Sequence, residues 1–387
     1  MGLFQLAIRN ALRHRLRTLL TVLGLAVATM ACGLINTVIE AWYASADASS
    51  STRLITRSAI SFTHPLPITQ APQIRSVPGV SGLTWLTWFG GIHGDNRQPF
   101  TKLAVDANSY FDLYPEYQLS DAQRRAFQQD RQGAVIGPKL AASLGLKIGD
   151  TLPIRGDKYP GAWAFTVRGI YQPRDHKADD ALMLVHWKLL SETLKARLGS
   201  GVPDVVGVYV VGVDDPALVP AVSARIDALF QDSAAGTKTQ SERAYQLSIV
   251  AMSHNVLLWL RIVSMGLVVI SLLVLTNAIT MSASERLREY ATLKALGFSP
   301  AYVATLLLCE SMVIACLAVL AGIALTYPAS ALFVSSVGSL VDGFTVSPGT
   351  LRMQASIALV VGLLAAAIPA WRMSRVNVAQ ALGSVRA

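Results

Sequence analysis

Residues 262–283 read IVSMGLVVISLLVLTNAITMSA, a run without a charged side chain. A helix needs about 20 apolar residues to cross the hydrocarbon core of a bilayer. This run therefore predicts a transmembrane helix, and three other runs have similar character: residues 18–39, about 301–327 and 353–369. A polar stretch of roughly two hundred residues follows the first run. The chain is thus predicted to be an α-helical membrane protein with four transmembrane helices and a large α+β extracytoplasmic domain between helices one and two.

The predicted boundaries follow from where polar residues resume. We expect a cytoplasmic amphipathic elbow helix, transmembrane helix 1, an extracytoplasmic domain, transmembrane helix 2, a cytoplasmic coupling helix, transmembrane helix 3, an outer loop, transmembrane helix 4 and a cytoplasmic tail. Their residues are, in that order, 1–17, 18–41, 42–255, 256–283, 284–300, 301–327, 328–352, 353–370 and 371–387.

Charge decides which side each segment occupies, because Lys and Arg near span ends resist translocation. The segments before span 1, between spans 2 and 3, and after span 4 together hold ten cations and only two acids, Glu285 and Glu289. The rest of the chain is nearly neutral. We therefore expect both termini in the cytoplasm of a bacterium, the four spans in its inner membrane, and the large domain in the periplasm.

The first apolar run has an alternative interpretation as a cleaved signal peptide, since Ala44-Ser45-Ala46 resembles a cleavage site. A signal core has about 7 to 15 apolar residues, fewer than this run has. The preceding segment also repeats Arg9, Arg13 and Arg17 every four residues. That spacing is typical of a helix lying on an anionic membrane surface, so we expect a retained elbow helix contacting lipid.

The sequence lacks the residues that several classes of protein function require. No GxxxxGK[ST] phosphate loop, nucleophile elbow or pair of metal ligands occurs, so no catalytic, metal or cofactor site is expected in this chain. The basic pI of 9.6 is explained by the three cytoplasmic segments, and a nucleic-acid partner is not expected. The three cysteines, 32, 309 and 316, all fall within predicted spans, where a thiol acts as a small apolar group.

The extracytoplasmic segment has a Ser- and Ala-rich beginning, and from Pro65 onward proline and glycine divide it into short pieces. Residues 41–57 are rich in Ser and Ala and are expected to continue the first span as a stalk helix. Residues 133–171 predict a small module of strand, short helix and two further strands. The aromatic residues 85, 88, 89 and 100 are expected in the hydrophobic core, with an aromatic ligand pocket as the alternative.

The segment between spans 2 and 3 predicts a short amphipathic helix. Apolar residues recur at helical spacing, Gly297 provides a stop, and Pro300 begins the next helix. On composition alone this helix is equally well interpreted as a solvated connector. Its sequence, from Ser284 to Pro300, is SERLREYATLKALGFSP.

This segment resembles the coupling loop of MacB/LolC/FtsX-type ABC transporter permeases, whose pattern is E-R-x-x-E-[IY]-[GA]-x-[LM]-[KR]-A-x-G-x-S. The elbow NALRHRLRTLLT from Asn10 and the tail PAWRMSRVNVAQAL from Pro369 are similar to those of the same family, although Val378 replaces the usual proline. Residues 137–150 with 165–170 look like the small β subdomain of MacB-like periplasmic regions, and residues 68–83 like the opening of their porter-like subdomain.

The resemblance implies a permease that is not itself an enzyme. In MacB the ATPase domain precedes the first span, whereas here seventeen residues do, so a separate ABC ATPase subunit is implied, with ATP and Mg bound by it. A second permease subunit, identical or related, and a periplasmic adaptor or substrate carrier complete the expected partners. The expected function is movement of an amphipathic substrate (a lipoprotein, peptide, lipid or drug) by mechanotransmission. The alternative is an FtsX-like regulator of a cell-wall hydrolase.

The resemblance also assigns roles to residues. Four charged side chains are expected on the ATPase surface, and three apolar ones in a groove on it. The residues implied in ATPase coupling are Glu285, Arg286, Leu287, Arg288, Glu289, Tyr290, Leu293, Lys294 and Gly297.

Glu310 lies inside predicted span 3, where an ionised side chain is costly and therefore suggests a function. Two interpretations remain open: Glu310 reaches Arg288 or water near the inner leaflet, or it takes part in coupling or substrate passage.

Overall fold

The computed structural model describes residues 13–94, 100–174, 178–199, 201, 203–337 and 346–374. These residues form two compact units. The helical unit contains residues up to 40, residues 254–333 and the described residues after 345. The outer unit contains residues 41–253 and the last turn of the third long helix. Arg9, the loop residues 338–345 and most of the predicted tail lie outside the described residues.

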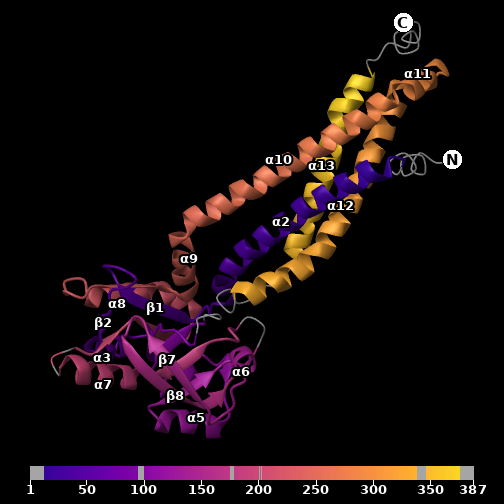
Figure 1. Ribbon diagram of the computed structural model, residues 1–387. Coiled ribbons are helices and arrows are strands. Elements are labelled where there is room, and N and C mark those ends of the chain that lie inside the picture. Colours follow the sequence, from indigo (N-terminus) through magenta and orange to yellow (C-terminus); the bar gives the residue numbers. More distant parts are fainter. Residues whose placement is uncertain are drawn as a thin grey trace. The chain divides into compact units, whose positions relative to one another are not determined.

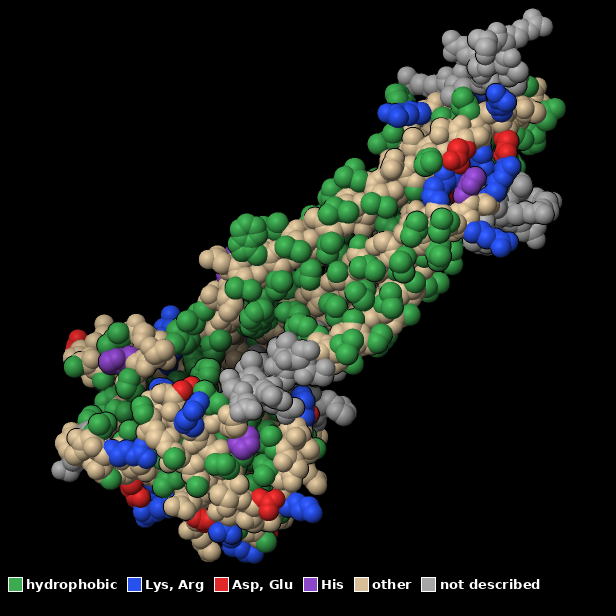
Figure 2. Space-filling model, in the orientation of Figure 1, with side chains coloured by type: hydrophobic (Ala, Val, Ile, Leu, Met, Phe, Trp, Pro, Cys, Tyr) green, Lys and Arg blue, Asp and Glu red, His purple; other side chains and the backbone are tan. Residues whose placement is uncertain are grey.

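In the described part of the helical unit there are four long helices and one short one, which are labelled in Figure 1. The long helices include stretches apolar enough to cross a membrane, which confirms the four predicted transmembrane helices. Their exposed faces carry mainly apolar side chains (Figure 2). The helices are α2 (Arg15–Ala48), α10 (His254–Glu285), α11 (Leu287–Ala295), α12 (Pro300–Val337) and α13 (Pro348–Ser374).

Small residues let these helices approach closely. A side chain on Gly322 of α12 would place its Cβ 2.8 Å from the Cβ of Thr29 on α2. Buried amide and hydroxyl groups join the same helices, since the Gln354 side chain of α13 donates to the Thr29 carbonyl and the Thr326 hydroxyl, each at 3.0 Å. Such close packing and interhelical hydrogen bonds are the usual basis of helix association in membranes. α12 extends past the predicted end of span 3 and includes Pro328.

The outer unit is built on one mixed nine-stranded sheet with the strand order β13-β1-β12-β3-β4-β10-β6-β8-β7. Two pairs, β4 with β10 and β6 with β8, are parallel, and the others are antiparallel. The strands are β1 (Arg53–Ser58), β3 (Val80–Trp88), β4 (Lys102–Val105), β6 (Gly133–Ile136), β7 (Thr151–Gly156), β8 (Gly161–Ile170), β10 (Met183–His186), β12 (Val208–Val213) and β13 (Thr237–Ser241).

Short pairs and helices complete this unit. The two-stranded sheets are β2 with β11 and β5 with β9. The remaining elements are β2 (Leu66–Pro67), η1 (Ile68–Gln70), α3 (Ala71–Arg75), α4 (Tyr110–Leu113), β5 (Tyr117–Gln118), α5 (Asp121–Gln129), α6 (Pro138–Leu144), β9 (Gln172–Pro173), α7 (Trp187–Leu198), β11 (Val205–Val206), η2 (Pro216–Leu218), α8 (Val219–Leu229) and α9 (Glu242–Met252).

Alternation along the strands gives the sheet two apolar faces. On β1, for example, Leu54 belongs to the core cluster on one face and Ile55 to the cluster on the other. The two-sided burial confirms the predicted α+β outer domain, and β6, α6, β7 and β8 form the predicted small module. Of the four expected core aromatics, residues 85, 89 and 100 belong to or pack against the first cluster. Trp88, by contrast, is 65% exposed, so its assignment to the core is wrong.

The predicted stalk helix is too long. α2 ends at Ala48, and Arg53–Ser58 is a strand in which every residue is buried. β1 pairs with β12 on one side and β13 on the other. Pairing on both edges satisfies the backbone along the strand, and this outweighs the helix-favouring composition of residues 41–57.

Candidate coupling site

α11 is a short helix with a well-formed end. The Gly297 N–H donates to the Lys294 carbonyl at 3.1 Å and the Phe298 N–H to the Leu293 carbonyl at 3.1 Å, which is the Schellman pattern. Gly297 has φ +93°, a conformation that glycine adopts without strain. The Ser299 hydroxyl then accepts the Tyr302 N–H at 3.3 Å, so α12 starts at once. The sequence predicted this helix and its stop.

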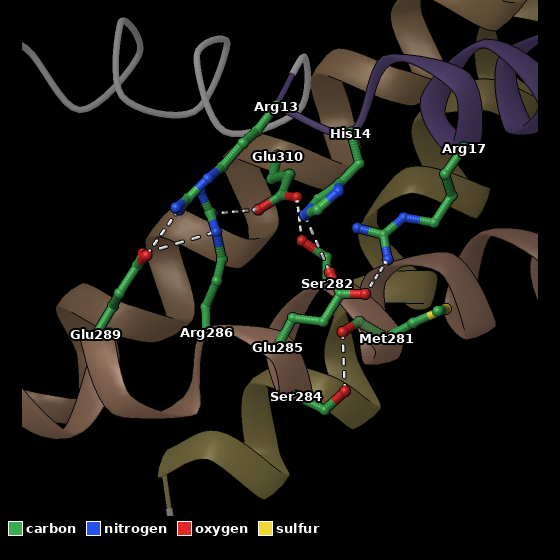
Figure 3. Close-up of polar contacts among 10 residues, drawn as sticks. All are labelled: Arg13, His14, Arg17, Met281, Ser282, Ser284, Glu285, Arg286, Glu289 and Glu310. Atoms are coloured by element: carbon green, nitrogen blue, oxygen red, sulfur yellow. Dashed lines mark hydrogen bonds and ion pairs between the residues drawn. The ribbon is translucent and has the colours of Figure 1, made fainter.

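A buried polar cluster joins α10, α11 and α12 (Figure 3). Glu310 of α12 is 2% exposed, and Arg286, which directly precedes α11, is 5% exposed. One Glu310 carboxylate oxygen accepts the Ser282 hydroxyl of α10 at 2.6 Å, and the other lies 3.5 Å from the Arg286 guanidinium. Breaking a buried pair by removing one partner is costly because the remaining charge has no water around it. Glu310 thus fixes the start of α11 to two long helices.

The partner of Glu310 differs from the one suggested by the sequence. Arg288 is exposed and has no part in the cluster, whereas Arg286 is turned inward. The Arg286 Nε also lies 3.7 Å from the Glu289 carboxylate. The interpretation in which Glu310 reaches Arg288 is therefore wrong about the partner.

The cations of the elbow contact the acids of the loop (Figure 3). The Arg13 guanidinium lies 2.7 Å from the Glu289 carboxylate, and the Arg17 guanidinium lies 2.8 Å from that of Glu285. His14 lies 3.3 Å from Glu285 as well. The side chains of Arg13 and Glu289 are more than half exposed, so their pair contributes at most about 1 kcal/mol. Membrane contact of Arg13 and Arg17 remains a prediction, and Arg9 lies outside the described residues.

The apolar side of α11 faces the chain's own helices. Tyr290 is 3% exposed within the core of the helical unit, and Leu293 packs against that core. Burial raises the pKa of Tyr290 to about 12, so its phenol is neutral at physiological pH. The Lys294 ammonium donates to the Met373 carbonyl of α13 at 2.9 Å. Leu287 is half-buried. The ATPase contacts of these four residues stay predictions.

The side of α11 that does not pack on the chain's own helices is exposed, and so is the end of the helix. At the end of α11, Leu296 is 71% exposed and Phe298 is 43% exposed, and Arg288 is exposed in its first turn. Phe298 also packs on Tyr302 of α12, with ring centroids 4.9 Å apart. The expected groove residues did not include Leu296 or Phe298. Their signal in the sequence was position, since both flank the glycine at which the helix ends.

Two family models match this chain. The family of MacB-like periplasmic core domains matches residues 18–229, and the family of FtsX-like permease C-terminal domains matches residues 261–378. The chain belongs to the MacB/FtsX-type permeases of ABC transporters. No relative was found among proteins with curated functions.

Three solved structures each match about half of this chain. The periplasmic region of MacB from Actinobacillus actinomycetemcomitans is 13% identical, with a TM-score of 0.38 over 52% of this chain and 94% of that one. The extracellular domain of the noncanonic ABC-type transporter YknZ from Gram-positive bacteria is 12% identical, with a TM-score of 0.36 over 49% and 100%. A domain of a putative permease protein from Porphyromonas gingivalis is 18% identical, with a TM-score of 0.34 over 49% and 88%.

Membership in the MacB/FtsX-type family has direct consequences. These permeases work with ABC ATPase partners, and permeases of this kind are typically non-catalytic. The four apolar helices and the periplasmic-like domain fit a protein of the bacterial inner membrane.

Proposed function

We propose that this MacB/FtsX-type permease transmits ATP-driven motion of a separate ATPase subunit to its outer domain. The motion would drive export or extraction of an amphipathic substrate such as a lipoprotein, peptide, lipid or drug. ATP and Mg would be bound by the ATPase, and the working unit would contain two permease subunits, identical or related. A periplasmic adaptor or substrate carrier would act with the outer domain.

The observation that carries this proposal is the buried contact of Glu310 with Ser282 and Arg286. Transmission of force requires a rigid connection between the docking element and the elements that move. α11 is held at its start by Glu310 and at its end by the hydrogen bond from Lys294 to α13. A displacement of α11 would therefore displace α10, α12 and α13 as well.

The arrangement of charge supports a cytoplasmic position for α11. Parts of all three segments that were predicted to be cytoplasmic meet at one end of the helical unit, where Arg17 contacts Glu285 and Lys294 contacts Met373. Charged side chains gather there (Figure 2). From the positive-inside tendency we infer that this end faces the cytoplasm.

The path outward from this end is continuous along the chain. α10 begins at His254, and only Ser253 separates it from α9 of the outer unit. α2 runs unbroken from Arg15 to Ala48. Two of the four spans therefore lead directly into the outer domain, as mechanotransmission requires.

The proposal is tested by purifying the tagged permease from its native membrane with and without Arg288→Glu. We expect an ABC ATPase to co-purify with the wild type, and the exposed charge reversal to reduce its recovery and the ATP hydrolysis of the complex about tenfold. Arg125→Glu reverses an exposed charge in the outer domain and should change neither. Recovery of the same ATPase with Arg288→Glu, at unchanged hydrolysis, would contradict the proposed docking.

The second candidate, an FtsX-like regulator of a cell-wall hydrolase, is favoured by the match of residues 261–378 to the FtsX-like domain. A hydrolase that co-purifies with the wild type, and whose activity follows ATP hydrolysis without movement of a solute, would favour this candidate over transport.

A further inference from the structure

The outer unit contains a cavity of about 860 Å³ that the coupling argument does not use. Its floor includes side chains of β3, β4 and β12. Leu86 on β3 lies opposite Val208 on β12, and Trp88 on β3 lies opposite Leu103 on β4. Because these side chains share one face of neighbouring strands, they form a continuous apolar floor.

Aromatic side chains surround this floor. Tyr110 stacks on Tyr114 with ring centroids 4.5 Å apart, and both line the cavity together with Trp88. The 65% exposure of Trp88 is unusual for the largest apolar side chain, and it is explained if a ligand covers the ring. The aromatic residues that line the cavity are Phe62, Trp88, Tyr110, Tyr114, Tyr117, Tyr159 and Tyr245.

The charged groups of the cavity balance one another. Three cations and three acids line it: Arg53, Lys158, Arg174, Glu116, Asp179 and Glu242. The guanidinium of Arg53 is held between two carboxylates, at 2.6 Å from Glu116 and 2.9 Å from Glu242, and it lies 4.2 Å from the centre of the Tyr114 ring. Its charge is thus compensated within the protein. The lining as a whole carries no net formal charge, which favours a ligand that carries none either.

Size restricts the ligand further. Small-molecule pockets typically enclose about 300–1,000 Å³ and combine an apolar lining with a few polar groups. This cavity lies in that range, so it suits a molecule of a few hundred daltons. A folded protein does not fit it.

We propose that this cavity binds an amphiphile of low molecular weight, uncharged or zwitterionic, with its apolar part on the sheet and its polar part among the aromatic hydroxyls and the paired charges. The site goes beyond the proposed function, which names neither this cavity nor the head group of the ligand.

The walls of the cavity include both chain segments that continue into the spans. The first consists of residues 48–50, where α2 ends, and the second is α9, which contributes Glu242, Tyr245 and Ile249. The Glu242 carboxylate accepts the Ser50 N–H at 2.8 Å, so the two segments are tied together at the cavity. A bound amphiphile would contact both of them.

The test uses the full chain in lipid nanodiscs and a phosphocholine amphiphile with one ten-carbon chain that carries a photoreactive diazirine. Mass spectrometry locates the cross-links. We expect labelling of the cavity strands and α9, in addition to lipid-facing residues of α10. Amphiphiles with the same chain and a sulfate or trimethylammonium head group should label the cavity at least about fivefold less.

Two variants at exposed positions keep the folding risk low. Trp88→Ala removes the exposed ring and Thr63→Trp fills part of the cavity, and each should reduce cavity labelling about fivefold or more. The matched control Leu198→Ala truncates a side chain that is 70% exposed and lies outside the cavity, and it should change nothing. In every variant the labelling of α10 is the internal standard.

A second arm places the diazirine on a two-chain phosphatidylcholine of the nanodisc. Cavity labelling from this lipid would identify the membrane as the source of the ligand, and labelling from the single-chain probe alone would identify the aqueous phase. Three results would overturn the proposal. These are labelling confined to the membrane helices, cavity labelling in Trp88→Ala and Thr63→Trp equal to that of the wild type, and stronger cavity labelling by an amphiphile with a charged head group. Since no ATPase or nucleotide is present, these results do not depend on whether the proposed coupling is correct.

Discussion

Replacing Glu310 with leucine should destabilise the helical unit by about 3 kcal/mol. The substitution removes the carboxylate from Arg286, which is 5% exposed, and leaves the Ser282 hydroxyl without its acceptor. Loss of one partner of a buried pair costs about 3–5 kcal/mol. We take the lower end because Glu289, 3.7 Å from Arg286, compensates part of the charge.

The double variant separates the charge effect from the loss of packing. With Arg286→Met added to Glu310→Leu, no buried charge remains, and apolar side chains of similar length occupy the same space. Replacement of a buried ion pair by apolar residues is often neutral or stabilising. We therefore expect the double variant within about 1 kcal/mol of the wild type, and at least about 2 kcal/mol more stable than Glu310→Leu alone.

The assay is reversible unfolding in bicelles, followed by ATP hydrolysis of the complex with its ATPase. Glu310→Leu should lower both stability and hydrolysis, and the double variant should restore both because α11 is fixed again. If Glu310→Leu alone unfolds within about 0.5 kcal/mol of the wild type, the ion pair does not hold α11. If the double variant regains stability without hydrolysis, the charges act in some way other than positioning the helix.

Three further predictions concern other sites. Arg53→Ala leaves the carboxylates of Glu116 and Glu242 without their shared cation and should lower the free energy of thermal unfolding by about 3–5 kcal/mol. Arg125→Ala, at an exposed position, should change that free energy by less than about 0.5 kcal/mol. Burial lowers the pKa of Lys102 to about 8, so between about pH 8 and 10.5 the unfolded chain binds more protons than the folded one. The free energy of unfolding of the wild type, relative to that of Lys102→Met, should therefore rise across that interval by up to about 3 kcal/mol. Urea unfolding measures this difference, and a difference that does not change with pH would contradict a buried amine. Leu296→Asp should abolish stimulation of the ATPase without changing thermal unfolding, since the side chain is 71% exposed, and Leu218→Asp in the outer unit should leave stimulation intact.

The sequence predicted the elements of the coupling site better than their contacts. Helical spacing and Gly297 indicated α11 and its end, and the cost of a buried acid singled out Glu310. Periodicity does not tell whether an apolar face packs on the chain's own helices or on a partner, so Tyr290 was assigned outward although it is 3% exposed. Similarly, spacing does not distinguish Arg286 from Arg288 as the partner of Glu310, because Arg286 lies at the break between α10 and α11, outside both helices.

The outer unit shows the same limit. Residues of alternating character predicted β6, β7 and β8, whose neighbours are close in the chain. β1 was missed because its partners, β12 and β13, begin at Val208 and Thr237, far along the sequence. Trp88 was assigned to the core for a related reason: it is adjacent to the buried Phe89, but successive side chains on a strand point to opposite faces.

The central claim is that α11 docks on an ATPase in the cytoplasm. A photo-crosslinking amino acid at position 298, which is 43% exposed in the wild type, tests it in intact cells. We expect an adduct with an ABC ATPase, and no such adduct when the same amino acid replaces Leu218 in the outer unit. Adducts of position 298 with periplasmic proteins would contradict a cytoplasmic docking site. Modification of a cysteine at the same position by a thiol reagent that does not cross the membrane would contradict it as well.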